Sequence, residues 1–121
     1  MVLSGYEATN RASVDEVAAQ SLHAYYKHVP AAVPGIVFLS GGQSDEDATA
    51  HLNAMNARGP HPWELSFSYG RALQAAAIKA WSGKPENVEA GQRAFYHRAK
   101  MNSAACTGVY APEMEREAVA V

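Results

Sequence analysis

The sequence is poor in the features that mark secreted, nucleic-acid-binding and membrane proteins. It has one cysteine, Cys106, so no internal disulfide can form and a reducing compartment is expected. Its 10 Lys and Arg and 12 Asp and Glu give a net charge of -2, so we expect no nucleic-acid partner. It has no signal-peptide pattern and no apolar run of bilayer length, which predicts a cytoplasmic protein without membrane contact.

Reactive or metal-binding side chains are also scarce. The five histidines do not have the spacing of metal ligands, so no metal site is expected (His23, His28, His51, His61 and His97). A nucleophilic lysine needs a desolvated pocket, and Lys79, Lys84 and Lys100 are predicted to be solvated. The same interpretation applies to the charged run Glu115-Arg116-Glu117, and Cys106 is predicted to be a small packing residue.

Four helices and two strands are predicted from local patterns. Ser13 and Glu16 have the spacing of a capping box, and Ile36–Leu39 is apolar at every position, which predicts a strand buried on both faces. The predicted order is a helix from Ser13 to about His28, a strand over 36–39, a helix from Ser44 to about Arg58, a strand over 63–67, a helix from Gly70 to Trp81, and a helix from Pro85 to about Gly108.

The strand–helix–strand order predicts a parallel pair of strands with a right-handed crossover. Four helices cannot cover both faces and both edges of two fully apolar strands. The chain is therefore predicted to be part of a larger α/β barrel or doubly wound sheet.

Each predicted strand is followed by a short loop that suits an anion. Ser40-Gly41-Gly42 follows the first strand, and Ser68-Tyr69-Gly70-Arg71 follows the second. Glycine N–H groups at a helix start and a planar guanidinium both bind phosphate well. The alternatives are a tight turn without a ligand, an Arg71 paired with a surface acid, and a Ser68 that caps the third helix. A dinucleotide site is weakly supported, since Gly41-Gly42 lacks the spaced glycine fingerprint.

Several segments resemble class I fructose-bisphosphate aldolase. They are residues 29–44 (VPAAVPGIVFLSGGQS), 52–56 (LNAMN), 62–63 (PW), 67–74 (FSYGRALQ), 80–81 (AW), 86–88 (ENV) and 102–103 (NS). The resemblance runs from Met1 to about Tyr110. It implies that residues 1–110 are the C-terminal part of a (β/α)₈ TIM barrel, strands seven and eight with flanking helices, and that residues 111–121 are a flexible tail.

The resemblance also implies a function and its residues. The family is a lyase of glycolysis that cleaves fructose 1,6-bisphosphate into two triose phosphates through a lysine Schiff base, without metal or cofactor. Members are usually homotetramers. Carried over by position, the substrate phosphate would be bound by residues of the two loops: Leu39, Ser40, Gly41, Gly42, Ser68, Gly70 and Arg71.

One departure from the family concerns the covalent chemistry. Met1-Val2 matches the end of the family's Lys-Pro-Asn-Met-Val segment, so the Schiff-base lysine is expected upstream of this chain. The acid/base carboxylates of the family lie earlier still, and the C-terminal tyrosine of eukaryotic members has no counterpart in Val119-Ala120-Val121. We therefore expect this chain to need the rest of the barrel and to be inactive alone. The alternative is a non-catalytic sugar-phosphate or anion-binding module, or the companion half of a split enzyme.

Overall fold

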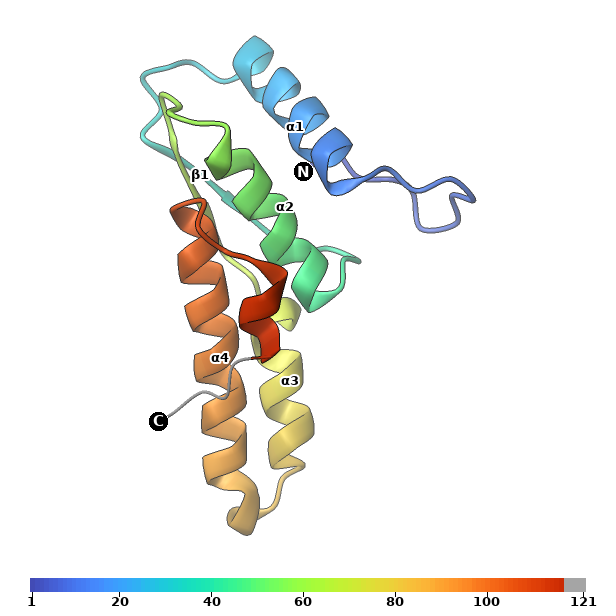
Figure 1. The fold of residues 1–121 in the computed structure, drawn as a ribbon, viewed down its shortest axis with the longest axis vertical. Coiled ribbons are helices and arrows are strands. Elements are labelled where there is room, and N and C mark those ends of the chain that lie inside the picture. The colour runs from blue at the N-terminus through green and yellow to red at the C-terminus, as the bar shows by residue number, and fades with distance from the viewer. Residues whose placement is uncertain (117–121) are drawn as a thin grey trace.

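A computed structural model describes residues 1–116 and has helices and strands in the predicted order (Figure 1). The elements are α1 (Val14–His28), β1 (Gly35–Phe38), α2 (Asp45–Ala57), β2 (Glu64–Phe67), α3 (Arg71–Trp81), η1 (Pro85–Asn87), α4 (Val88–Cys106) and η2 (Pro112–Arg116), where η denotes a 3-10 helix. Within this part of the chain, no helix combines the length and the apolar content needed to cross a bilayer.

Two helix starts follow the local rules from which they were predicted. The Ser13 hydroxyl accepts the N–H of Glu16 at 3.2 Å, and the Glu16 carboxylate accepts the N–H of Ser13 at 2.7 Å, which confirms the capping box of α1. The Ser44 hydroxyl accepts the N–H of Asp47 at 3.0 Å at the start of α2. Both starts are set by contacts within four residues, which is why the sequence predicts them.

The two strands pair in parallel, with Ile36 opposite Leu65 and Phe38 opposite Phe67. These four residues share one face of the sheet, where Phe38 and Leu65 are buried. Val37, which lies on the other face, is 63% exposed. The prediction that the first strand is buried on both faces is therefore wrong for this chain, because its helices cover only one face.

Helix α2 is the centre of the packing. It contacts α1, α3, α4 and β2, and Figure 1 shows it beside the strands, between α1 and α4. Ala48, Leu52 and Met55 have no exposed surface, which agrees with the apolar positions predicted for this helix. Two polar residues, Thr49 and His51, are buried on the same helix. Five of the 13 residues of α2 are buried, so a loop that bonds to this helix is fixed to the core of the molecule.

Helices α3 and α4 form a hairpin that extends away from the strands (Figure 1). Glycine inside a helix costs about 1 kcal/mol relative to alanine, yet Gly91 lies within α4. A Cβ atom there would lie 3.0 Å from the Cβ of Trp81 and 3.3 Å from the carbonyl oxygen of Ala77. Gly91 therefore permits the close approach of the two helices.

The segment after α4 folds back onto that helix. The Glu115 side chain, on η2, is 11% exposed and accepts hydrogen bonds from Arg98 at 2.6 and 2.8 Å. The prediction that Glu115 is solvated is wrong, because the turn at Gly108 returns the chain to the buried Arg98. Arg116 is exposed, as expected, whereas Glu117 and the rest of the tail to Val121 lie outside the described residues.

Candidate functional site

The first candidate loop, residues 39–43, is a tight turn between β1 and α2 that we call the glycine loop. The N–H of Gln43 donates to the carbonyl of Ser40 at 3.1 Å, and Gly41 has φ +54°, a conformation that favours glycine. Ser40 is buried, whereas Leu39, Gly41 and Gly42 are exposed. Within residues 1–116, the N–H groups of Gly41 and Gly42 have no hydrogen-bond acceptor, so both can donate to a ligand.

The second candidate loop, residues 68–71, follows β2, and we call it the arginine loop. Its Ser68 N–H donates to the carbonyl of Phe38 at 2.8 Å, which continues the pairing of the strands. Tyr69 is buried, and its hydroxyl donates to the carbonyl of Ala48 at 2.7 Å. Burial raises the pKa of Tyr69, so the phenol stays protonated and remains a donor. These two bonds fix the arginine loop against β1 and α2.

Arg71 joins the two loops. Its Nη2 donates to the carbonyl of Gly41 at 3.1 Å and to the carbonyl of Gln43, and its Nη1 lies 3.3 Å from Oδ1 of Asp45. Half of the Arg71 side chain remains exposed beside the glycine loop. The structure therefore brings Arg71 next to the glycine loop, although the two loops are almost 30 residues apart in sequence.

The start of α3 differs electrostatically from the starts of α1 and α2. The first turns of α1 and α2 contain acidic residues and a serine cap, but α3 begins with Gly70 as its N-cap and has neither an acid nor a capping side chain. The alternative that Ser68 caps this helix is thus wrong. An uncapped N-terminus carries partial positive charge, and the guanidinium of Arg71, which also pairs with Asp45, lies at this start. Together they favour an anion.

Three polar residues near the loops were not predicted as site residues: Gln43, Asp45 and His51. The Gln43 amide donates to the carbonyl of Ser40 at 2.7 Å, and its Oε1 lies 2.6 Å from Nδ1 of His51. Asp45 is the acid that pairs with Arg71. His51 could have been noticed because it lies three residues after Ala48 and four before Met55, on the apolar side of a helix, where a polar residue needs a partner.

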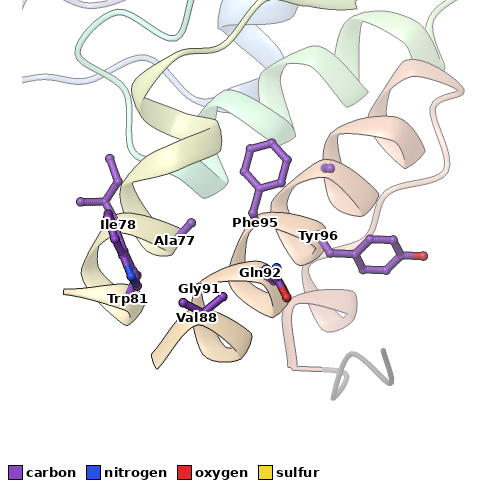
Figure 2. A pocket seen from close by; sticks show the side chains of 9 residues that line it. Ala77, Ile78, Trp81, Val88, Gly91, Gln92, Phe95 and Tyr96 are labelled. Carbon is purple, nitrogen blue, oxygen red and sulfur yellow. The ribbon is translucent and has the colours of Figure 1, made fainter. Parts of the chain in front are cut away.

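An apolar groove of the described surface lies elsewhere, between α3 and α4. Its volume is about 710 Å³, and Figure 2 shows Ile78 and Trp81 from α3 and Val88 and Phe95 from α4 along it. None of the residues along this groove carries a charge, so the groove does not suit a phosphate. No residue of the glycine loop or the arginine loop lines the groove, so it is separate from the candidate site.

We expect the isolated 121-residue chain to self-associate. Val37 and Leu39 are 63% and 75% exposed beside unpaired strand edges, and Ile78, Trp81 and Phe95 expose a second apolar surface. Such surfaces and edges favour association. Sedimentation velocity at several concentrations should show species larger than a monomer. A single 13.0 kDa species across the range would contradict this expectation.

The side chains needed for metal or covalent catalysis are not gathered in residues 1–116. No group of three or more His, Cys, Asp or Glu there is arranged to hold a metal ion. The four lysines of the sequence are all exposed (Lys27, Lys79, Lys84 and Lys100). The described site thus consists of backbone N–H groups, a helix N-terminus and one guanidinium.

Comparison with known proteins gives consistent matches. A family model described as fructose-bisphosphate aldolase class-I matches residues 1–120. The chain is 54% identical over 119 residues to fructose-bisphosphate aldolase of Echinococcus multilocularis and 52% identical over 117 residues to the chloroplastic fructose-bisphosphate aldolase 2 of Pisum sativum. These alignments cover 98% and 97% of this chain and 33% of each relative.

A solved structure of the Plasmodium falciparum enzyme, in complex with TRAP and a small-molecule inhibitor, is also similar. It matches with a TM-score of 0.87 and 48% identity, covering 89% of this chain and 31% of that one. The chain thus spans about a third of the length of the relatives that it matches.

Proposed function

Because the chain belongs to the class I fructose-bisphosphate aldolase family, we propose that its glycine and arginine loops bind a phosphate of a sugar bisphosphate. The single observation that carries this proposal is Arg71, which links the carbonyls of the glycine loop to the uncapped start of α3. The unpaired N–H groups of Gly41 and Gly42 lie on the same loop. In this proposal Leu39, Ser40, Ser68 and Gly70 shape the two loops around the anion.

We further propose that residues 1–110 are the C-terminal part of a (β/α)₈ barrel and that β1 and β2 are its strands seven and eight. The exposed face of β1 and the unpaired edges of both strands support this placement, since a closed barrel would cover them. In barrels generally, the loops after the last two strands often form a phosphate site. From the family resemblance we also propose that the protein forms a homotetramer and lies in the cytoplasm. The pea relative described above is, by contrast, named as chloroplastic.

For the whole protein we propose the cleavage of fructose 1,6-bisphosphate into two triose phosphates. In this reaction, the described residues would bind one phosphate of the substrate and so orient its carbon chain. Remote binding of this kind helps the reaction by fixing geometry before the bond breaks. The covalent step would come from a lysine amine outside the described site, because each lysine of this chain is exposed.

The binding proposal is tested by calorimetric titration of the 121-residue chain with fructose 1,6-bisphosphate. We expect saturable binding that inorganic phosphate competes away, because the proposed contacts recognise the phosphate group alone. Binding should weaken as salt is raised, since a surface guanidinium is screened. The absence of saturable binding to both ligands would contradict the proposed function.

Borohydride treatment in the presence of dihydroxyacetone phosphate should leave the mass of this chain unchanged. A Schiff base needs an unprotonated amine, and an exposed lysine lacks the desolvation that would make its amine reactive. Intact-mass spectrometry is the measurement, and a full-length class I aldolase treated in parallel is the positive control. A stable adduct on any of the four lysines would show that this chain carries covalent chemistry of its own.

A further inference from the structure

A buried polar chain supports the glycine loop from the side of α2. Gln43 and His51 are each 7% exposed. The Gln43 Nε2 donates to the carbonyl of Ser40 at 2.7 Å, within the same turn that the Gln43 N–H closes. The Gln43 Oε1 lies 2.6 Å from Nδ1 of His51. The side chain of Gln43 therefore ties the turn to a residue on the central helix.

The direction of these bonds fixes the tautomer of His51. Because the Gln43 amide nitrogen donates to Ser40, the amide oxygen must be the acceptor, and His51 must carry a proton on Nδ1. Burial lowers the pKa of His51, which opposes the effect of nearby Asp47 and agrees with a neutral ring at neutral pH. Both the neutral Nδ1–H form and the protonated ring donate to Gln43, so protonation alone does not break this link.

The same residue connects the loop to Arg71. The carbonyl of Gln43 accepts a hydrogen bond from Arg71, while its side chain is held by His51. If Gln43 turned away, the Ser40 carbonyl would lose one donor and the acceptor for Arg71 would move. The position of the guanidinium relative to Gly41 and Gly42 thus depends on how Gln43 is held.

We propose that His51 is a positioning residue for phosphate binding, which acts through Gln43 to hold the glycine loop and Arg71 in their binding arrangement. This inference rests on the proposed function. It goes beyond that function by assigning a role to a buried side chain that makes no hydrogen bond to Arg71 and acts through Gln43. An apolar residue at this place on α2 would fill the space beside Ala48, Leu52 and Met55, but it would leave the oxygen of Gln43 without a donor.

The test uses three variants of the 121-residue chain and calorimetric titration with fructose 1,6-bisphosphate. His51→Phe keeps a planar ring without a donor, His51→Asn keeps an N–H near the place of Nδ1, and Gln43→Leu removes the link itself. We expect His51→Phe and Gln43→Leu to weaken binding by roughly tenfold each, as the loss of a bond to a buried acceptor does. His51→Asn should bind within about twofold of the unmodified chain.

The double variant His51→Phe/Gln43→Leu separates positioning from general packing. If His51 acts through Gln43, the second substitution should add almost nothing to the first. Two independent tenfold losses that multiply would overturn the inference, as would a His51→Asn variant that binds no better than His51→Phe. The ¹⁵N shifts of His51 provide a separate check, because they report whether Nδ1 carries the proton.

Failure of this inference is distinguishable from failure of the proposed function. If Arg71→Ala weakens binding by about 30-fold but His51→Phe and Gln43→Leu bind like the unmodified chain, the inference alone is wrong. If the unmodified chain binds no phosphate, the proposed function fails and the inference fails with it. Should His51→Phe not fold, as judged by circular dichroism, Gln43→Leu and His51→Asn decide. Weakened binding in the first and near-normal binding in the second support the inference, and any other result overturns it.

Discussion

Replacing Arg71 with alanine is expected to reduce the affinity of the chain for fructose 1,6-bisphosphate by about 30-fold, or about 2 kcal/mol. Arg71 is the one cation that bonds to the glycine loop among residues 1–116, and a charge-assisted bond to phosphate contributes about 1.5–3 kcal/mol. We use the lower part of this range because the side chain is 48% exposed and is screened by solvent. Isothermal titration calorimetry measures the effect.

Two further variants define the role of Arg71 more narrowly. Arg71→Lys keeps the charge but loses the planar fork, so its affinity should lie between those of the unmodified chain and Arg71→Ala. Arg93→Ala removes an equally exposed arginine on α4 whose partner is Glu89, and it should leave binding unchanged. Equal affinities of Arg71→Ala and Arg93→Ala would rule out the proposed site while leaving the fold untouched.

Replacing Glu115 with glutamine is expected to lower the free energy of unfolding by about 3 kcal/mol. Arg98 and Glu115 form a buried ion pair whose side chains are 5% and 11% exposed. Glu115 also accepts hydrogen bonds from His97 at 2.8 Å and from Tyr110 at 3.0 Å. Removal of its charge leaves the guanidinium of Arg98 buried without a counter-ion, and the Nε of Arg98 already lacks a hydrogen-bond partner. Urea denaturation at a fixed protein concentration is the measurement, because self-association contributes to apparent stability.

The same pair predicts a dependence of stability on pH. Burial alone would raise the pKa of Glu115, but hydrogen bonds from Arg98 and His97 outweigh it and hold that pKa below its ordinary value. A carboxylate with a lowered pKa in the folded state stabilises fully above its unfolded pKa of about 4.5. This contribution is lost as the pH falls through the folded pKa. The stabilities of the unmodified chain and Glu115→Gln should therefore converge as the pH falls through the lowered, folded-state pKa of Glu115.

Glu113→Gln is the matched control, since Glu113 lies on the same short helix and is exposed. It should change the free energy of unfolding by less than about 0.5 kcal/mol at every pH. Equal effects of the two substitutions at neutral pH, or a difference between Glu115→Gln and the unmodified chain that does not shrink at all as the pH is lowered below the unfolded pKa of about 4.5, would show that the charge of Glu115 does not stabilise the fold.

Much of the fold could be predicted because it depends on contacts between near neighbours in sequence. Ser13 and Ser44 cap their helices through residues three positions away, and the glycines at 41 and 83 adopt positive φ, as turns there require. The glycine loop and Arg71 were also predictable as candidates, since a strand end followed by Gly-Gly or Gly-Arg is a local pattern. The glycine loop and Arg71 lie close together because the strands that precede them pair in parallel.

Predictions failed where the environment of a residue depends on distant parts of the chain. The apolar run of β1 predicted two covered faces, yet Val37 is exposed, because a sequence pattern does not show how many helices are present to cover a sheet. Glu115 belongs to a charged run that predicted solvent exposure, yet its side chain is only 11% exposed and bonds to Arg98, 17 residues earlier. Nothing in the local sequence indicates this return of the chain.

The sequence by itself determined the order of helices and strands, their caps and stops, and the two loops that present an arginine and free glycine N–H groups, because short-range hydrogen bonds and side-chain periodicity set all of these. Only the tertiary structure decided which polar groups of separate elements pair: Gln43 with His51, Arg98 with Glu115, and the half-exposed Arg71 with the carbonyls of the glycine loop. The physical reason is that a buried polar atom takes whichever donor or acceptor the packing of separate elements brings within hydrogen-bond distance, and sequence spacing does not specify that distance.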